Sequence, residues 1–388
     1  MNFSPAFHLF LLSVTTSLLA PCLFAADRVV GTNATLETIA GARSAGVGGA
    51  AMAVDEDYLE LSENPYQLAG VQNGWAAFSH VAYYEGTQYD YASAVFPLGP
   101  GQGLGIGFSR FGADDIPWIP EGEPIPEGSD YSTFSIADYV LSLDWGRRFG
   151  KLEAGLSFHG LYRDLGDQTG WGFRGDMGAR YPVFRFLDVS ALLKGWTSSA
   201  ATWESDEFEY SSPELYIAGN FKQSVPYFYG TLRLLWQSAG FFHREDRNES
   251  WDGEAHGGRL WSSPVDWLAG GRAGAEFDFD FGLSLRGGFA EIGEPESWTA
   301  GAGLKLSNWF EIDYAFESHP ELSAVHRVSL QVSPGLFLYP PKKSAAAETL
   351  GAAPAKMKSV SQEEPLETGT PEVKTAPEEE SAGGTWEE

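Results

Sequence analysis

The sequence predicts an all-β chain: a transmembrane antiparallel β-barrel of about fourteen strands, with an N-terminal plug (hatch) segment and a disordered C-terminal tail. Three observations predict this fold. Apolar and polar residues alternate with a period of two over most of the chain. Short and long connections between the alternating stretches themselves alternate, as in outer-membrane barrels. After its first residues, the chain has no run of roughly twenty apolar residues, so it would have to cross a membrane as a closed barrel.

The first 26 residues are predicted to be a secretory signal peptide. An apolar run without Asp or Glu ends in small residues before Asp27, which places cleavage near Ala25 or Ala26. The alternative is an uncleaved N-terminal anchor. The only cysteine, Cys22, lies within this leader, so the mature chain is expected to have neither a disulfide nor thiol chemistry.

Residues 27–73 are predicted to form a plug inside the barrel. Their small-residue run contains glycines that would each weaken a water-exposed helix by about 1 kcal/mol, so close packing against a wall is the better use. An Asn-Pro step then forces a turn. The alternative is an ordinary cap over a soluble barrel. The candidate plug residues are Arg43, Gly46, Gly48, Gly49, Asp55, Asp57, Asn64 and Pro65.

Residues 74–334 are predicted to be the transmembrane barrel. In the stretch 310–316, for example, Phe310 and Ile312 face one side while Glu311 and Asp313 face the other. The same test along the chain predicts strands that start near Trp75, Tyr89, Gly103, Thr133, Lys151, Gly172, Leu187, Pro213, Tyr227, Trp267, Gly282, Ser297, Phe310 and Ala324.

The connections between these strands are sorted by length. Tight turns are predicted at 97–103, 147–151, 223–227, 279–282 and 307–309. The intervening connections include long loops at 113–132, 198–212 and 238–266. Since such barrels have short turns on the periplasmic side and longer loops outside, both termini are expected on the periplasmic side.

Charges of both signs are predicted to face the lumen from the last strands. Charges in a narrow, partly dry lumen are costly unless they are paired, so they are expected to pair with one another or with Arg43 and residues 55–57. Such pairs indicate either a polar pathway or a latch that holds the plug. The candidate lumen residues are Arg272, Glu276, Arg286, Lys305, Glu311, Asp313, Glu317 and Arg327.

Residues 335–388 are predicted to be a disordered acidic tail in the periplasm. After Pro341 they are mainly Ala, Pro, Glu, Ser, Thr and Lys, which cannot bury enough apolar surface to fold. The net charge of −28, without a block of Lys or Arg, excludes nucleic acid as a partner.

The sequence contains no convincing catalytic constellation, so an enzyme is not expected, nor is a cofactor. Ser157 and His159 point the same way on one strand, but no third member of a triad is evident. His243, Asp246, Asp252, Glu254 and His256 share one loop; solvation of that loop is the preferred interpretation and cation binding the alternative, so no metal site is assigned.

Five segments carry a resemblance to a known family: GARSAGVGGA (41–50), ENPYQLA (63–69), FSH (78–80), YDYASAVFPL (89–98) and AVHRVSL (324–330). They resemble the PorV/PorQ family of outer-membrane proteins, relatives of the FadL-type hydrophobic-compound transporters. That resemblance implies a fourteen-stranded barrel with an N-terminal hatch. The chain departs from the family at Tyr66 and Gln67, where Ala and Gly are usual, and in its acidic tail.

The expected location is therefore the bacterial outer membrane, as a multi-pass barrel in contact with outer-membrane lipid. The expected function is passive transport of small hydrophobic or amphipathic compounds. The first alternative is a non-transporting component of protein secretion or envelope assembly, with protein partners, as the PorV resemblance implies. A purely structural envelope anchor is the second alternative.

Overall fold

The computed structural model describes residues 33–118, 132–197, 199–204, 208–211, 213–240, 270–293, 295–319, 322 and 324–335. The predicted leader and almost all of the predicted tail lie outside the described residues. The loop with the candidate cation ligands His243 to His256 lies outside them too.

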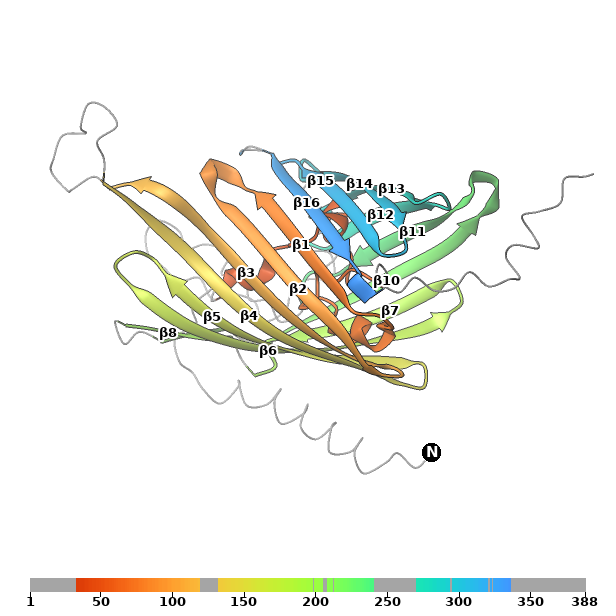
Figure 1. Cartoon of the computed structure of the whole chain (residues 1–388), viewed down its shortest axis with the longest axis horizontal. Helices are drawn as coiled ribbons and strands as arrows, with labels where there is room; N and C mark the ends of the chain where they lie inside the picture. Colours follow the sequence, from red (N-terminus) through yellow and green to blue (C-terminus); the bar gives the residue numbers. More distant parts are fainter. Residues whose placement is uncertain are drawn as a thin grey trace, which may run out of the picture. The chain divides into compact units, whose positions relative to one another are not determined.

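Fourteen wall strands close into one antiparallel ring (Figure 1). The first, β1 (Trp75–Ala82), pairs with β2 on one side and with the last, β16 (Val325–Val332), on the other. The strands between them are β2 (Gln88–Gly99), β3 (Gln102–Pro117), β4 (Thr133–Phe149), β5 (Leu152–Asp164), β6 (Thr169–Phe184), β7 (Leu187–Lys194), β10 (Glu214–Val225), β11 (Gly230–Gln237), β12 (Arg272–Phe279), β13 (Leu283–Phe289), β14 (Trp298–Ser307) and β15 (Phe310–Glu317). The predicted fold class and strand number are confirmed.

The connection predicted as a loop at 198–212 contains two further strands, which corrects that prediction. β8 (Ser199–Trp203) pairs with β6 beyond the end of β7, and β9 (Phe208–Ser211) pairs with β8. β7 and β8 are thus two parts of one wall strand, and β9 prolongs β10. Pro213 sits at the second interruption, where its missing N–H cannot join a ladder.

The two ends of the barrel differ in the length of their connections. On one side the strands are joined by tight turns, such as those between β2 and β3 and between β4 and β5, where Gly101 and Gly150 have φ of 72° and 66°. β1 begins and β16 ends on this short-turn side. The other side carries the longer connections, including those at 118–132 and 238–271.

The two faces of the wall have opposite character. Outward residues are large and apolar, as at Phe108 and Leu141, which are 50% and 61% exposed. Many inward residues are polar and buried, as at Asp144, His159 and Asp176, each 0% exposed, and others, such as Val95 and Leu235, are buried and apolar. The chain therefore has an apolar exterior and a polar interior, the reverse of a water-soluble barrel.

Residues 33–74, here named the luminal segment, fill the interior (Figure 1). The segment contains three short helices: η2 (Ala34–Glu37), α2 (Ala42–Gly46) and η3 (Pro65–Gly70). α2 packs on β13 to β16, whereas η3 packs on β3 to β6, so the segment spans the ring. None of the helices in the described ranges has the length and hydropathy needed to span a bilayer.

Candidate functional site in the barrel lumen

The glycine turn of the luminal segment meets the wall backbone to backbone. A Cβ on Gly46 would lie 3.2 Å from the Cα of Gly301 in β14. A Cβ on Gly48 would overlap the carbonyl of Phe289, and this residue also has a φ of 69°. Gly49 has a φ of 78°, and a Cβ there would meet side-chain atoms of Ile39 and of Arg272 in β12. Only glycine allows this approach without a shift of the wall.

Arg43 joins the luminal segment to the wall through a buried ion pair. Its Nε and Nη2 donate to the two carboxylate oxygens of Glu276 at 2.9 and 3.0 Å. Its Nη1 donates to the carbonyl oxygen of Asp55 at 2.9 Å. Both ends of the pair are buried, so the bond fixes where α2 sits rather than adding much net stability.

The carboxylate of Glu276 also accepts hydrogen bonds from two arginines of the wall. Arg286 Nε donates to Glu276 at 2.7 Å and Arg233 Nη1 donates to it at 2.8 Å. Arg286 Nη1 also donates to Asp313 at 2.5 Å, and Glu311 lies 3.9 Å from the guanidinium. These contacts bring candidate lumen residues from β12, β13 and β15 into one network with Arg43.

The other candidate lumen residues lie apart from this network. Arg327 donates to Glu317 at 2.6 Å and to the carbonyl oxygen of Ile39 at 3.3 Å, so it too holds the luminal segment. Lys305 is exposed at the short-turn side, 3.8 Å from Glu56.

A second ion-pair group, which the sequence did not indicate, holds the opposite side of the segment. Glu37 accepts from Arg174 of β6 at 2.5 Å and from Lys194 of β7 at 2.5 Å. Lys194 also pairs with Glu63. These inward positions follow the same period of two as the last strands, so extending the search for lumen charges to β4–β7 would have found them.

Residues 55–57 do not behave as one acidic turn. The carboxylate of Asp55 pairs with Arg180 of β6, and only its backbone carbonyl contacts Arg43. Asp57 is 1% exposed, and neither carboxylate oxygen has a hydrogen-bond partner among the described residues. Burial raises the pKa of Asp57 to about 6, although Arg43 opposes the shift. Burial and the neighbouring Asp57 likewise raise the pKa of Glu60 well above its ordinary value.

The Asn-Pro step starts η3 and anchors it. The side-chain amide of Asn64 donates to the carbonyl oxygen of Val54, and Pro65 occupies the first helical turn, where its missing N–H costs nothing. Tyr66, where the PorV/PorQ pattern has a small residue, is fully buried and donates to the carbonyl oxygen of Met52.

Ser157 and His159 point the same way on β5, as predicted; both face the lumen, but they have different partners. Ser157 donates to Asp144 at 2.5 Å. His159 contacts Ser142 at 2.8 Å and Asp176 at 3.2 Å. All of these groups are buried, so a substrate carbonyl has no access to the Ser142 hydroxyl.

A polar hollow of about 480 Å³ lies at the short-turn side between the luminal segment and the wall. Its walls carry equal numbers of basic and acidic side chains, which come from both the segment and the strands. They are Arg148, Lys151, Arg180 and Lys222, with Asp55, Glu56, Glu153 and Asp188. Within the described residues no group of three or more His, Cys, Asp or Glu side chains is arranged to hold a metal ion.

No protein-family model and no curated protein sequence matches this chain, so the PorV/PorQ resemblance gains no support. Three of the solved structures similar to it are a toluene transporter, TbuX of Ralstonia pickettii, the CymD monoaromatic hydrocarbon channel and a Pseudomonas aeruginosa FadL homologue. The first has 13% identity over 76% of this chain and 98% of TbuX, with a TM-score of 0.47. CymD has 13% identity over 76% of this chain and 97% of CymD, with a TM-score of 0.46. The FadL homologue has 9% identity over 76% of this chain and 98% of its own, with a TM-score of 0.42. At such values neither substrate nor residue roles can be transferred to this chain.

Proposed function

We propose that this chain is a bacterial outer-membrane β-barrel protein that passively transports small hydrophobic or amphipathic compounds. The observation that carries the membrane location is the inverted wall. Phe108, Leu141 and similar large apolar side chains are exposed on the outside, while charged residues are buried inside. A contiguous apolar exterior of this kind is stable in hydrocarbon and unfavourable in water.

The luminal segment is the proposed gate. It is fixed to the wall by ion pairs and hydrogen bonds on opposite sides, through Arg43 and Glu276 and through Glu37 and Lys194. Buried apolar contacts also join the segment to the wall, such as those of Val47 and Val54 with Leu235. A moving gate must therefore break contacts of both kinds. The polar hollow beside Arg180 gives the segment a water-accessible edge on the short-turn side.

In this proposal residues 1–26 are a cleaved leader, 27–73 the gate, 74–334 the barrel and 335–388 a periplasmic tail. Short turns face the periplasm, so β1 and β16 place both ends of the barrel on that side. No feature of the described residues favours the alternative role in secretion or envelope assembly.

A disulfide lock tests the gate. The backbone N–H of Ala42 donates to the Ser329 hydroxyl at 2.8 Å, so Ala42→Cys with Ser329→Cys places two thiols across the interface of segment and wall. The only native cysteine is Cys22 in the predicted leader. Uptake of a small aromatic hydrocarbon into liposomes, together with single-channel conductance, is measured for the oxidised and reduced double variant.

Transport through a moving segment predicts uptake that is lost on oxidation and restored on reduction. Each single-cysteine variant serves as control and should be insensitive to the oxidant. A variant that lacks residues 27–73 should take up the compound faster or conduct more. If both the intact and the truncated protein show no uptake and no conductance, transport is ruled out.

A further inference from the structure

The inner face of β1, β2 and β3 carries no charged side chain over most of its height. Over the ranges 75–81, 89–95 and 103–111 the odd-numbered residues face inward, and each of them is apolar, serine, tyrosine or glycine. The strands on either side do carry buried inward charges, at Asp144 of β4 and Arg327 of β16. A sector of three charge-free strands therefore runs between the short-turn side and the long-loop side.

An apolar cluster joins the long-loop end of this sector to the luminal segment. Val81 and Tyr89 of the wall pack with Ala40 of the segment, and all three are buried. Tyr83 and Phe111 pack against the cluster, and their rings meet edge to face with centroids 5.5 Å apart. The outer end of this contact is therefore lined largely by aromatic rings.

A second apolar cluster joins the short-turn end of the sector to the segment. Ala77 and Val95 of the wall pack with segment residues that include Leu61 and Leu68. Tyr91 of β2 packs against both clusters and links them. The two clusters joined through Tyr91 are here named the apolar seam, which follows β1–β3 along the lumen from one end to the other.

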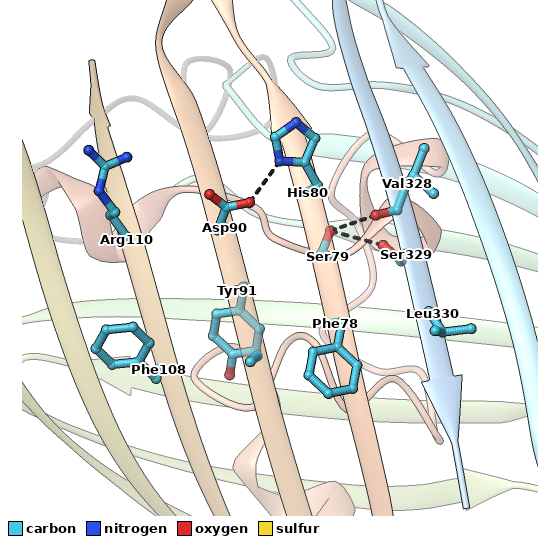
Figure 2. Close-up of a pocket in the computed structure, with 11 residues that line it drawn as sticks. Phe78, Ser79, His80, Asp90, Tyr91, Phe108, Arg110, Val328, Ser329 and Leu330 are labelled. Carbon is cyan, nitrogen blue, oxygen red and sulfur yellow. Dashed lines mark hydrogen bonds and ion pairs between the residues drawn. The ribbon is translucent and has the colours of Figure 1, made fainter. Parts of the chain in front are cut away.

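Two neutral hydrogen bonds tie the luminal segment to the wall along the apolar seam. The Ser79 hydroxyl donates to the carbonyl oxygen of Ala40 at 2.6 Å, and the Ser93 hydroxyl donates to that of Tyr58 at 2.5 Å. Ser79 also lies 3.0 Å from the Ser329 hydroxyl of β16 (Figure 2). The segment is held to other walls by buried ion pairs, and hydrogen bonds to charged groups are roughly twice as strong as neutral ones. The segment should therefore separate from β1–β3 before it separates from the walls that hold its ion pairs.

Glu60 stands between Leu59 and Leu61, both of which belong to the apolar seam. Its carboxyl group accepts a hydrogen bond from the backbone N–H of Gly41 at 2.7 Å. Burial and the neighbouring Asp57 hold the pKa of Glu60 well above its ordinary value, so its neutral form is favoured. An ion that entered the seam would lose its water without gaining a partner, whereas an uncharged apolar compound replaces the contacts that the segment gives up.

We propose that the apolar seam is the route by which the transported compound crosses the lumen, and that this compound is uncharged. It enters at the long-loop end, where the rings of Tyr83 and Phe111 offer apolar contacts, passes Tyr91 and leaves beside Val95. The disulfide lock at Ser329 acts on this route, because that residue lies opposite β1 in register. The proposal rests on the proposed function and narrows it, since it excludes amphipathic anions such as carboxylates.

The test compares one thiol in the seam with one on a wall that carries ion pairs, in the full-length protein reconstituted in liposomes. Cys22→Ser removes the only native cysteine, and Ser93→Cys places the thiol in the seam. Ser190→Cys of β7 is the matched control, because Ser190 is also buried and its hydroxyl also donates to a carbonyl oxygen of the segment, that of Met52, at 3.5 Å. Labelling by uncharged N-phenylmaleimide and by a cationic thiosulfonate is followed by mass spectrometry.

We expect N-phenylmaleimide to label Ser93→Cys at least about tenfold faster than Ser190→Cys, because the segment opens first along the seam. Naphthalene should slow this labelling, whereas naphthalenecarboxylate, the same ring system with a negative charge, should not. The cationic reagent should label Ser93→Cys no faster than Ser190→Cys. Labelled Ser93→Cys should lose most of its naphthalene uptake above that of protein-free liposomes, relative to its own unlabelled form. Ser190→Cys treated in the same way should keep its uptake.

Equal labelling of the two thiols, equal protection by naphthalene and its carboxylate, or undiminished uptake after complete labelling of Ser93→Cys overturns the proposal. Labelling and protection are measured without transport, so the two proposals can fail separately. Uptake by the unaltered protein without protection of Ser93→Cys by naphthalene rejects the seam as the route and leaves transport standing. Absence of uptake in the unaltered and the truncated protein rejects transport and, with it, the route, even where naphthalene protects the thiol.

Discussion

Arg43 of the luminal segment grips Glu276 of β12 with two parallel hydrogen bonds, at 2.9 and 3.0 Å, inside a barrel whose polar side faces inward. The bond joins residues 233 positions apart and is the central contact between the segment and the wall. Glu276 also accepts hydrogen bonds from Arg233 and Arg286, so the two residues of the Arg43–Glu276 pair are not equivalent.

Substitutions at the two ends of this ion pair should therefore lower the free energy of unfolding by different amounts. Glu276→Gln leaves three arginines without their shared carboxylate and should lower the free energy of unfolding by about 3 kcal/mol or more. Arg43→Met should cost less, since Glu276 keeps two partners. Chemical unfolding in detergent measures both, and combining the two changes in one chain gives their coupling energy. A larger loss for Arg43→Met than for Glu276→Gln contradicts this assignment.

Protonation of the buried Asp57 should stabilise the folded protein as the pH falls from about 7 to about 4. The pKa of Asp57 is raised from 3.8 to about 6, so the folded protein binds this proton more tightly than the unfolded chain. Its contribution to stability is complete below pH 3.8 and is lost as the pH rises through about 6. Glu60 acts in the same direction. Asp57→Asn should therefore flatten the pH dependence of the unfolding midpoint between pH 4 and about 7.

Glu56→Gln is the control for this titration, because the side chain of Glu56 is 70% exposed. It should leave the profile unchanged. An Asp57→Asn profile identical to that of the unaltered protein would show that Asp57 does not carry the dependence.

Substitution of alanine for glycine in the glycine turn should lower the free energy of unfolding for two separable reasons. At Gly48 a Cβ meets both a positive φ and the Phe289 carbonyl, whereas at Gly86 the φ of 79° has open space around it. Gly86→Ala should cost about 1 kcal/mol from backbone strain alone. Gly48→Ala should cost at least about 2 kcal/mol more, because β13 or the segment must move. Equal unfolding free energies for the two variants would mean that the close approach is absent in solution.

The position of the wall in the bilayer can be tested by introducing an arginine at one of two outward positions and comparing the loss of stability. Leu141 lies at the middle of β4 and Leu98 lies beside the β2–β3 turn, and both face outward and are exposed. Leu141→Arg should destabilise the protein folded in bilayers by about 2–4 kcal/mol and Leu98→Arg by about 1 kcal/mol or less. Similar small costs at both positions would argue against a membrane-embedded wall.

The interior charges show where prediction from the sequence reached its limit. The period of two places Glu276, Arg286 and Asp313 on the inner face, and their pairing with one another and with Arg43 follows the expectation that lumen charges need partners. The two-residue period does not show that Asp55 pairs with Arg180, or that Asp57 is buried without an ion pair among the described residues. Those outcomes depend on how residues 33–74 thread through the closed ring.

By itself, the sequence determined the all-β class, the number of wall strands, the sorting of the turns and the faces of each strand, because these follow from a local two-residue period and from turn residues. Only the tertiary structure decided what lies beside what. The register of fourteen strands brings His80, Asp90 and Arg110 into one outward row, and it makes residues 199–203 and 208–211 part of the wall. Register and threading are set by contacts between residues distant in the chain, which a local pattern does not encode.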